Sequence, residues 1–270
     1  MTSDPSCCGP SEEQSDHPPS TDRTEIVRDR YGAIASAETD CCDEPSDVAD
    51  PDERGREIGY ADDDLTAAPE GANLGLGCGN PVALAALEPG ETVLDLGSGS
   101  GFDCFLAARE VGPEGQVIGV DMTPEMLDRA RENARESDLE TVEFRLGEIE
   151  HLPVADESID VIISNCVINL SEAKRQVLAE AYRVLKPGGR LSIADLVATE
   201  PLPEAVRADP DPVAGCVGDA ARIEQFERWL TEIGFDAIDI TVEGEWDATY
   251  EGESLPIVSA RIEAVVPDGD

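Results

Sequence analysis

Three cysteines lie far apart in this sequence, each in a predicted loop or at a predicted strand end. Cys78 lies in the loop GANLGLGCGNP, Cys166 in SNCVIN after an apolar run, and Cys216 in PVAGCVGDA. Three thiolates that converge form a soft, pyramidal ligand set for a thiophilic centre. Zinc prefers four ligands, usually with CxxC-type spacing, which does not occur here. The alternative is burial as small apolar groups, which we favour for Cys104 in FDCFLAARE.

A second motif, GSGSG at residues 97–101, follows the apolar run Thr92–Leu96. Glycines between a strand and a helix let backbone N–H groups approach a bound ligand. The GxGxG spacing differs from the GxGxxG of a nicotinamide dehydrogenase, the alternative interpretation. Asp121 ends the next predicted strand, where a carboxylate can accept hydrogen bonds from both ribose hydroxyls. Because Asp95 disfavours a pyrophosphate beside the glycines, the pattern predicts a nucleoside cofactor that carries positive charge.

Strands and helices alternate regularly from residue 91. Helices are predicted over residues 102–110, from Thr123 onward and over Ser171–Leu185, which the turn Lys186–Gly189 closes. A later helix lies near Arg222–Ile233. The predicted strands are Thr92–Leu96, Gln116–Val120, Val142–Leu146, Ile159–Ser164, Arg190–Val197 and two segments near residues 237–243 and 257–265. This alternation predicts an α/β fold with a mostly parallel, doubly wound sheet and helices on both faces.

Five stretches in order over roughly residues 70–200 resemble the class I S-adenosylmethionine-dependent methyltransferases: VLDLGSGSG, VIGVDMT, FRLGEIEHLP, IDVIISNCVINL and RVLKPGGRLSIAD. The resemblance implies a Rossmann-like fold and S-adenosylmethionine as the cofactor. It also implies a set of cofactor-binding residues. These are Asp95, Gly97, Ser98, Gly99 and Gly101 around the methionine and ribose, Asp121 and Met122 at the ribose and adenine, Glu148 and Ile149 beside the adenine, and Asn165 at the floor.

A narrower resemblance, to the arsenite methyltransferase family, covers about residues 24–265. It rests on YGAIA…CC at 31–42, IGY at 58–60, NLGLGCGNP, SNCVINL and AGCVGDA. Family members bind trivalent arsenic through three cysteines, which fall here on Cys78, Cys166 and Cys216. A further N-terminal cysteine, here Cys41 or Cys42, forms a disulfide relay with the first of them. Tyr60 is implied near the cofactor, although IGYADDDL departs from the family's tyrosine-glycine-tyrosine wording.

The chemistry implied by this resemblance needs no general base, and the chain offers few. His17 lies in the N-terminal tail, and His151 follows the adenine-side strand and is expected to be structural. Three thiolates would hold arsenite, free or as a thiol conjugate, so that its lone pair attacks the methyl group of the sulfonium. Thioredoxin or a small thiol is the implied reductant.

Two other functions fit parts of the pattern. A quinone- or sterol-type small-molecule methyltransferase would use the cysteines for packing alone. A non-catalytic protein that sequesters metalloids would use the thiols but not the glycine loop or Asp121. A purely acidic structural or interaction protein would explain none of the ordered motifs.

The 270 residues include 60 acidic and 19 basic side chains, for a net charge of −41. Such a surface repels nucleic acid and anionic membranes, and we expect neither as a partner. Excess carboxylate with few lysines and aromatics indicates adaptation to a high-salt cytoplasm, and the N-terminus shows no secretory signal.

We predict four parts along the chain. Residues 1–23 form a disordered acidic tail, and 24–88 form a helical and loop cap with one helix over Thr24–Ala37, loop-like residues 38–64 and a helix that can begin at Asp62. Residues 89–200 form the S-adenosylmethionine-binding core. Residues 201–270 form the C-terminal part of the sheet, with the arsenic-binding loop.

Overall fold

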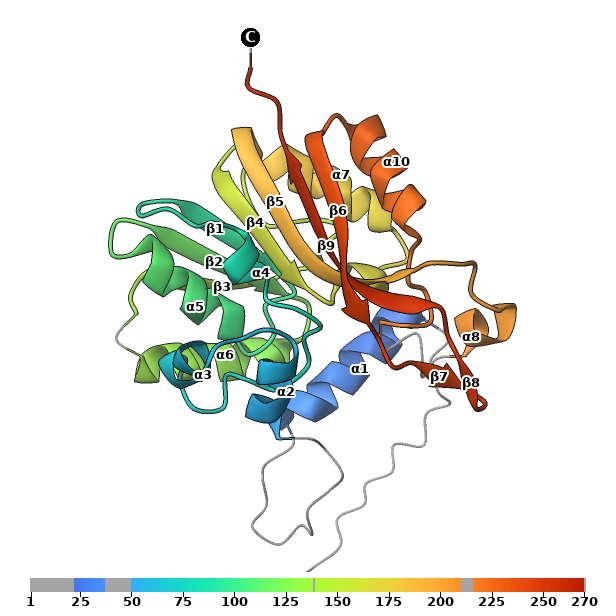
Figure 1. The fold of residues 1–270 in the computed structure, drawn as a ribbon. Helices are drawn as coiled ribbons and strands as arrows, with labels where there is room; N and C mark the ends of the chain where they lie inside the picture. Colours follow the sequence, from blue (N-terminus) through green and yellow to red (C-terminus); the bar gives the residue numbers. More distant parts are fainter. Residues whose placement is uncertain (1–21, 37–49, 138, 210–215, 270) are drawn as a thin grey trace, which may run out of the picture.

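The computed structural model describes residues 22–36, 50–137, 139–209 and 216–269 (Figure 1). Its centre is a seven-stranded sheet in the order β3-β2-β1-β4-β5-β9-β6. The strands are β1 (Thr92–Leu96), β2 (Gln116–Asp121), β3 (Val142–Leu146), β4 (Ile159–Asn165), β5 (Leu185–Ala198), β6 (Asp236–Glu245) and β9 (Ile257–Val265). The first five pair in parallel, and β9 runs antiparallel between β5 and β6. The predicted α/β fold and class I topology are confirmed.

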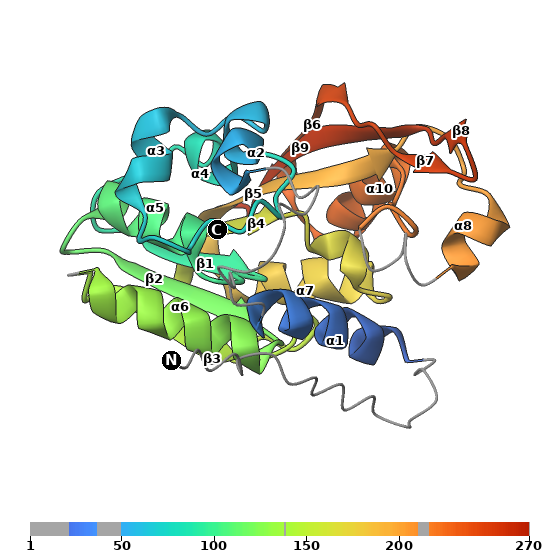
Figure 2. The same cartoon turned by 90° about the horizontal axis from the view of Figure 1, so that it is seen from below.

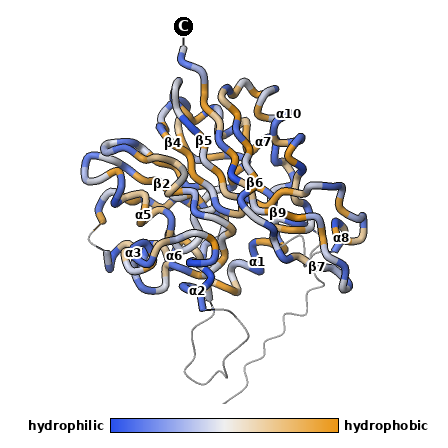
Figure 3. Tube along the Cα trace, viewed as in Figure 1, coloured by the Kyte–Doolittle hydropathy of each residue, from blue (hydrophilic) through white to orange (hydrophobic). Residues whose placement is uncertain are grey.

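Helices cover both faces of the sheet because successive side chains of the buried strands point to opposite sides. Leu94 and Leu96 of β1 belong to the core that also contains residues of α7 (Lys174–Val184) and α10 (Ile223–Ile233). Val93, which precedes Leu94, packs with α5 (Phe102–Val111) and α6 (Pro124–Glu136) on the other face. Figure 3 shows the apolar residues gathered in the strands and polar residues along the outer segments.

The N-terminal segments lie across the edge of the sheet where β1, β2 and β4 end. Helix α1 (Arg23–Ser36) packs beside α6, and α2 (Pro51–Glu57), α3 (Asp62–Ala67) and α4 (Pro81–Leu84) follow it (Figures 1 and 2). The prediction that residues 38–64 are loop-like is wrong over α2. Asp50 accepts a hydrogen bond from the backbone N–H of Asp52 at 3.0 Å, and Pro51 starts the helix. An aspartate cap followed by proline is a helix-start signal.

Three further details differ from the predicted elements. Helix α7 begins at Lys174 rather than Ser171, because the short 3-10 turn η1 (Ile168–Leu170) and a bend precede it. Strand β5 already pairs with β4 at Leu185, and the register shifts before Arg190, so residues 186–189 lie within the strand. Helix α8 (Glu204–Ala208) and the hairpin of β7 (Thr249–Tyr250) and β8 (Glu253–Ser254) had no predicted counterpart.

Within the described residues, none of the helices combines the length and apolar character needed to cross a bilayer.

Candidate active site

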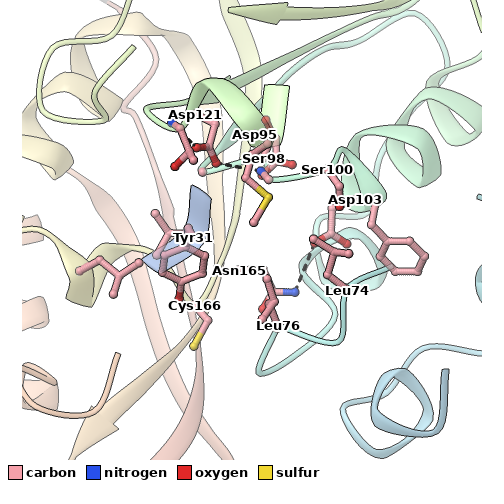
Figure 4. A pocket seen from close by; sticks show the side chains of 18 of the residues that line it. Tyr31, Leu74, Leu76, Asp95, Ser98, Ser100, Asp103, Asp121, Asn165 and Cys166 are labelled. Carbon is pink, nitrogen blue, oxygen red and sulfur yellow. Dashed lines mark hydrogen bonds between the residues drawn. The ribbon is translucent and has the colours of Figure 1, made fainter. Parts of the chain in front are cut away.

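A cavity opens at the carboxyl edge of the sheet, between the loops after β1, β2 and β4, with α1 across it (Figure 4). In doubly wound sheets this edge is where ligands bind. Thr24, Val27 and Tyr31 of α1 line one side. Most residues predicted to bind the cofactor also line this cavity: Tyr60, Asp95, Gly97, Ser98, Gly99, Asp121, Met122, Ile149 and Asn165.

The glycine loop and Asp121 form one hydrogen-bonded unit. The backbone N–H of Gly99 donates to Asp121 Oδ2 at 2.9 Å, and that of Thr123 donates to Oδ1 at 2.8 Å. Gly97 has φ +70°, and a Cβ there would lie 2.5 Å from Val167, so only glycine fits. A Cβ on Gly99 would meet little beyond Met126 Sδ at 3.9 Å and would project into space left for a ligand. The carboxylate is thereby fixed where ribose hydroxyls can reach it.

Two buried carboxyl groups lie behind the glycine loop. Asp103 accepts a hydrogen bond from the Tyr60 hydroxyl at 2.6 Å and one from Asn165 Nδ2 at 3.2 Å (Figure 4). Burial raises the pKa of Asp103 to about 6. Burial, followed by repulsion from Asp103, raises the pKa of Asp95 well above its usual value. A bound cation would relieve this repulsion, so the donor set fits the sulfonium and ammonium of S-adenosylmethionine.

Two of the predicted cofactor residues lie outside the cavity lining. Gly101 immediately precedes α5 and has φ +92°. A Cβ there would lie 2.7 Å from the Phe144 ring, so its role is in packing the helix start. The Glu148 side chain is half-exposed and pairs with Arg28 of α1 at 3.5 Å. Their neighbours Ser100 and Ile149 face the cavity instead.

The structure brings Cys78, Cys166 and Cys216 together in one apolar cluster with Leu196 and Ala198. All three thiols are free and buried. The Cys78 thiol donates to the carbonyl of Ala194 at 3.6 Å, and the Cys216 thiol donates to the carbonyl of Cys166 at 2.7 Å. Cys166 also lines the cavity described above, so the cluster adjoins that cavity (Figure 4).

The backbone at two of these cysteines is strained. Cys166 has φ +59° and Cys216 has φ +66°, in the left-handed region that non-glycine residues rarely adopt. Such conformations persist only where the surrounding structure enforces them, and they gather at functional sites. Both of these strained cysteines belong to the same cluster.

The protonated form of the thiols is favoured in this arrangement. Burial is the main cause that raises the pKa of Cys78, while contact with Cys166 and then burial raise the pKa of Cys216 well above its usual value. The Tyr31 hydroxyl hydrogen-bonds with Cys216, and burial followed by the two neighbouring thiols raises the pKa of Tyr31. A centre that binds sulfur strongly must therefore drive the loss of the thiol protons.

Sequence reasoning missed Tyr31, Asp103 and Asp195 as site residues. Asp195 is fully buried in β5, and one of its carboxylate oxygens lies within 4.8 Å of the sulfurs of Cys78 and Cys166. Burial raises its pKa to about 6. The sequence feature that could have revealed Asp195 is an acidic residue inside the otherwise apolar run LSIADLVA. The relay candidates Cys41 and Cys42 lie outside the described residues.

Comparison with known proteins agrees with this geometry. Residues 87–234 match the family model described as a methyltransferase domain. An arsenite methyltransferase of Halobacterium salinarum is 53% identical, over 91% of this chain and 67% of that protein. The human arsenite methyltransferase is 41% identical over 53% of this chain and 40% of its own length. The chain thus spans about two thirds of the first of these relatives and matches less than half of the second.

A solved structure of a similar protein shows the same similarity at the level of the fold. The crystal structure of CrArsM, an arsenic(III) S-adenosylmethionine methyltransferase from Chlamydomonas reinhardtii, shares 35% identity. The match covers 80% of this chain and 73% of that one, with a TM-score of 0.63. The fold, the glycine loop and the cavity define a class I methyltransferase that uses S-adenosylmethionine. Within that class, the chain belongs to the arsenite methyltransferase family.

Proposed function

We propose that this chain transfers methyl groups from S-adenosylmethionine to trivalent arsenic held by Cys78, Cys166 and Cys216. The observation that carries the proposal is the convergence of three thiols, from segments far apart in the sequence, beside the nucleoside cavity. Cys166 belongs to both sites, so the acceptor held by the thiols lies next to the methyl donor.

The cofactor-binding roles follow from the cavity. Asp121, fixed by two backbone N–H groups, would accept the ribose hydroxyls. Asp95 and Asp103 would supply negative charge for the cationic donor. Asn165 Nδ2 donates to the Tyr60 hydroxyl at 2.9 Å, while its Oδ1 accepts from the backbone N–H of Cys78 at 2.9 Å. Asn165 thus connects the cofactor side to the loop that carries the first thiol.

Methyl transfer from S-adenosylmethionine to arsenic needs no proton acceptor. The arsenic lone pair forms the new bond to carbon, and the electron pair of the breaking C–S bond stays with the departing sulfur. The chain contributes positioning: it holds the arsenic in line with the methyl group in a buried pocket, and this lowers the activation barrier. All three thiol side chains are less than 10% exposed, so water is excluded from the acceptor.

Methylation leaves arsenic pentavalent, and two electrons must return it to the trivalent state. We propose that two thiolates supply them by forming a disulfide, with Cys78 as one partner and Cys41 or Cys42 as the other. Thioredoxin or a small thiol would then reduce that disulfide. This scheme places the chain in arsenic detoxification, in the cytoplasm, where such reductants are present.

The test is methyl transfer from labelled S-adenosylmethionine to arsenite, in molar KCl with excess thiol. Cys78→Ser, Cys166→Ser and Cys216→Ser should each lose about 100-fold or more in rate, because the acceptor is no longer held in line. Binding of S-adenosylmethionine should remain. Cys104→Ser is the matched control, since Cys104 is buried outside the thiol cluster and a serine hydroxyl can replace its thiol as the donor to Asp95 Oδ2.

Two results would contradict the proposal. Binding of both ligands without transfer would indicate a metalloid-sequestering protein. Failure to bind arsenite would indicate that the cysteines only fill space and that the acceptor is a small organic molecule.

A further inference from the structure

A second cavity, of about 650 Å³, lies between α7, α8 and the start of α10. Four basic side chains line it, with Trp229 beside them: Lys174, Arg175, Arg207 and Arg222. Only two acidic residues, Glu172 and Asp219, belong to the same lining. In a chain with 60 acidic and 19 basic residues, a cavity with a basic excess runs against the composition. Its charge points to an anionic ligand.

The negative charge of Asp219 is already matched by cations. Its carboxylate lies 2.5 Å from Lys174 Nζ and 3.1 Å from the Arg23 guanidinium. The Arg207 guanidinium is farther away, at 3.6 Å, and its side chain is 61% exposed. Lys174 is buried and committed to this pair and to the carbonyl of Ser171. Asp219 is therefore shared by three cations, and its single negative charge does not neutralise all of them.

The three arginines of the lining make only long ion pairs. Arg175 lies 3.5 Å from Glu232, and Arg222 lies 3.9 Å from Glu224. Within the described residues, neither these two guanidinium groups nor that of Arg207 donates a hydrogen bond. Guanidinium groups bind carboxylates through paired hydrogen bonds, and this capacity is unused here. Three such groups around one cavity suit a ligand with more than one carboxylate.

The first turn of α7 adds to the positive potential. Glu172 to Gln176 border the cavity, and Ala173, the residue before the helix, provides no side-chain cap. The N-terminal N–H groups of an 11-residue helix carry a partial positive charge that favours anions. The helix N-terminus thus adds to the positive potential that the arginines create in the cavity.

The basic cavity and the thiol cluster share a wall. Ala198, Leu202 and Ala220 line the cavity, and the same three residues pack in the cluster with Cys78, Cys166 and Cys216. Ala220 follows Cys216 by four residues in the chain, and its N–H donates to the carbonyl of Val217, the residue after Cys216, at 3.1 Å. A ligand anchored by its carboxylates in this cavity can therefore extend a sulfur toward the cysteines.

We propose that this cavity binds the carboxylates of a small acidic thiol, which presents arsenic to the three cysteines as a thiolate complex. The inference rests on the proposed function and adds to it a binding site and a ligand class. Arsenic stays trivalent in the exchange. A cysteine sulfur forms a bond to arsenic, the bond from arsenic to the carrier sulfur breaks, and the cysteine proton leaves on the carrier as its thiol. Three exchanges transfer the metalloid completely.

Binding can be tested without arsenic or methyl transfer. S-Methylglutathione carries two carboxylates and a blocked sulfur, and Trp229 in the lining reports its binding by fluorescence. We expect saturable binding that weakens about tenfold for Arg207→Gln or Arg222→Gln, the loss of one charge-assisted contact. Arg228→Gln, on the same helix α10 but outside the lining, is the matched control and should bind like the wild type. Equal binding by all variants would overturn the proposal.

Kinetics with two arsenic conjugates test the link to the thiols. The KM of the wild type should be about tenfold lower for arsenite complexed with glutathione than with 2-mercaptoethanol, which has no carboxylate. Arg207→Gln and Arg222→Gln should remove that difference with kcat unchanged. Equal KM values for both conjugates in the wild type would contradict the inference while leaving the proposed function intact. Absence of methyl transfer from either conjugate would contradict the proposed function, and S-methylglutathione binding would still decide whether the cavity takes acidic thiols.

Discussion

The two cavities on either side of the thiol cluster carry opposite charge. The cofactor cavity has Asp95, Asp103 and Asp121 in its lining, whereas the second cavity has Arg175, Arg207 and Arg222. The cluster of Cys78, Cys166 and Cys216 touches both, through Cys166 on one side and Ala198, Leu202 and Ala220 on the other.

The contrast shows how one chain can bring a cation and an anion to the same point. A cationic methyl donor is favoured on the acidic side, and an acidic carrier of arsenic is favoured on the basic side. Under these proposals each ligand has its own cavity, so neither has to pass the other. Changes on one side should then leave the other ligand unaffected.

The largest loss of cofactor affinity is expected for a substitution of Asp121, on the acidic side. Asp121→Ala should weaken S-adenosylmethionine binding about 100-fold, because the ribose loses a carboxylate acceptor and the glycine loop loses its anchor. Calorimetric titration of the cofactor measures this loss. Arsenite binding by the same variant should match the wild type, and Asp128→Ala, at an exposed position of α6, is the control. Parallel loss of both ligands would show that the two sites are not separate.

A smaller, pH-dependent effect is expected at Asp103, whose pKa burial raises to about 6. Below pH 6 the group is protonated, and above it the group is charged. Because a cationic ligand favours the charged form, affinity for S-adenosylmethionine should rise as the pH rises through about 6 and then level off.

In Asp103→Asn this rise should disappear, with affinity about tenfold lower at neutral pH. The exposed Asp63→Asn is the control and should keep the pH dependence. A pH profile for Asp103→Asn that matches the wild type would show that this carboxyl does not respond to the cofactor.

The fold and the cofactor side of the site were largely predictable from the sequence. Thr92–Leu96 is a short, mostly apolar run, and Val142–Leu146 alternates apolar and charged residues. Both strands begin and end where predicted. The glycine spacing placed the loop, and Asp121 followed from its position at the end of the next strand. A local sequence pattern is enough to predict a structural feature that a single segment forms.

Features assembled from several segments were not predictable in this way. Tyr31 reaches Cys216 from a helix almost at the start of the described chain. The basic cavity draws its cations from α7, α8 and the residue before α10, and no stretch of the sequence shows them as a cluster. The polar segment PDERGRE gave no periodic signal for α2, which its cap and first proline start instead.

The most direct test of the account is arsenic X-ray absorption on the full chain loaded with arsenite, with S-adenosylmethionine absent. Three sulfur neighbours and no oxygen are predicted for the wild type. One sulfur should be replaced by oxygen in Cys166→Ser, and Cys104→Ser should keep all three. Fewer than three sulfurs in the wild type, or an unchanged arsenic environment in Cys166→Ser, would contradict the three-thiol site on which both sides of the comparison depend.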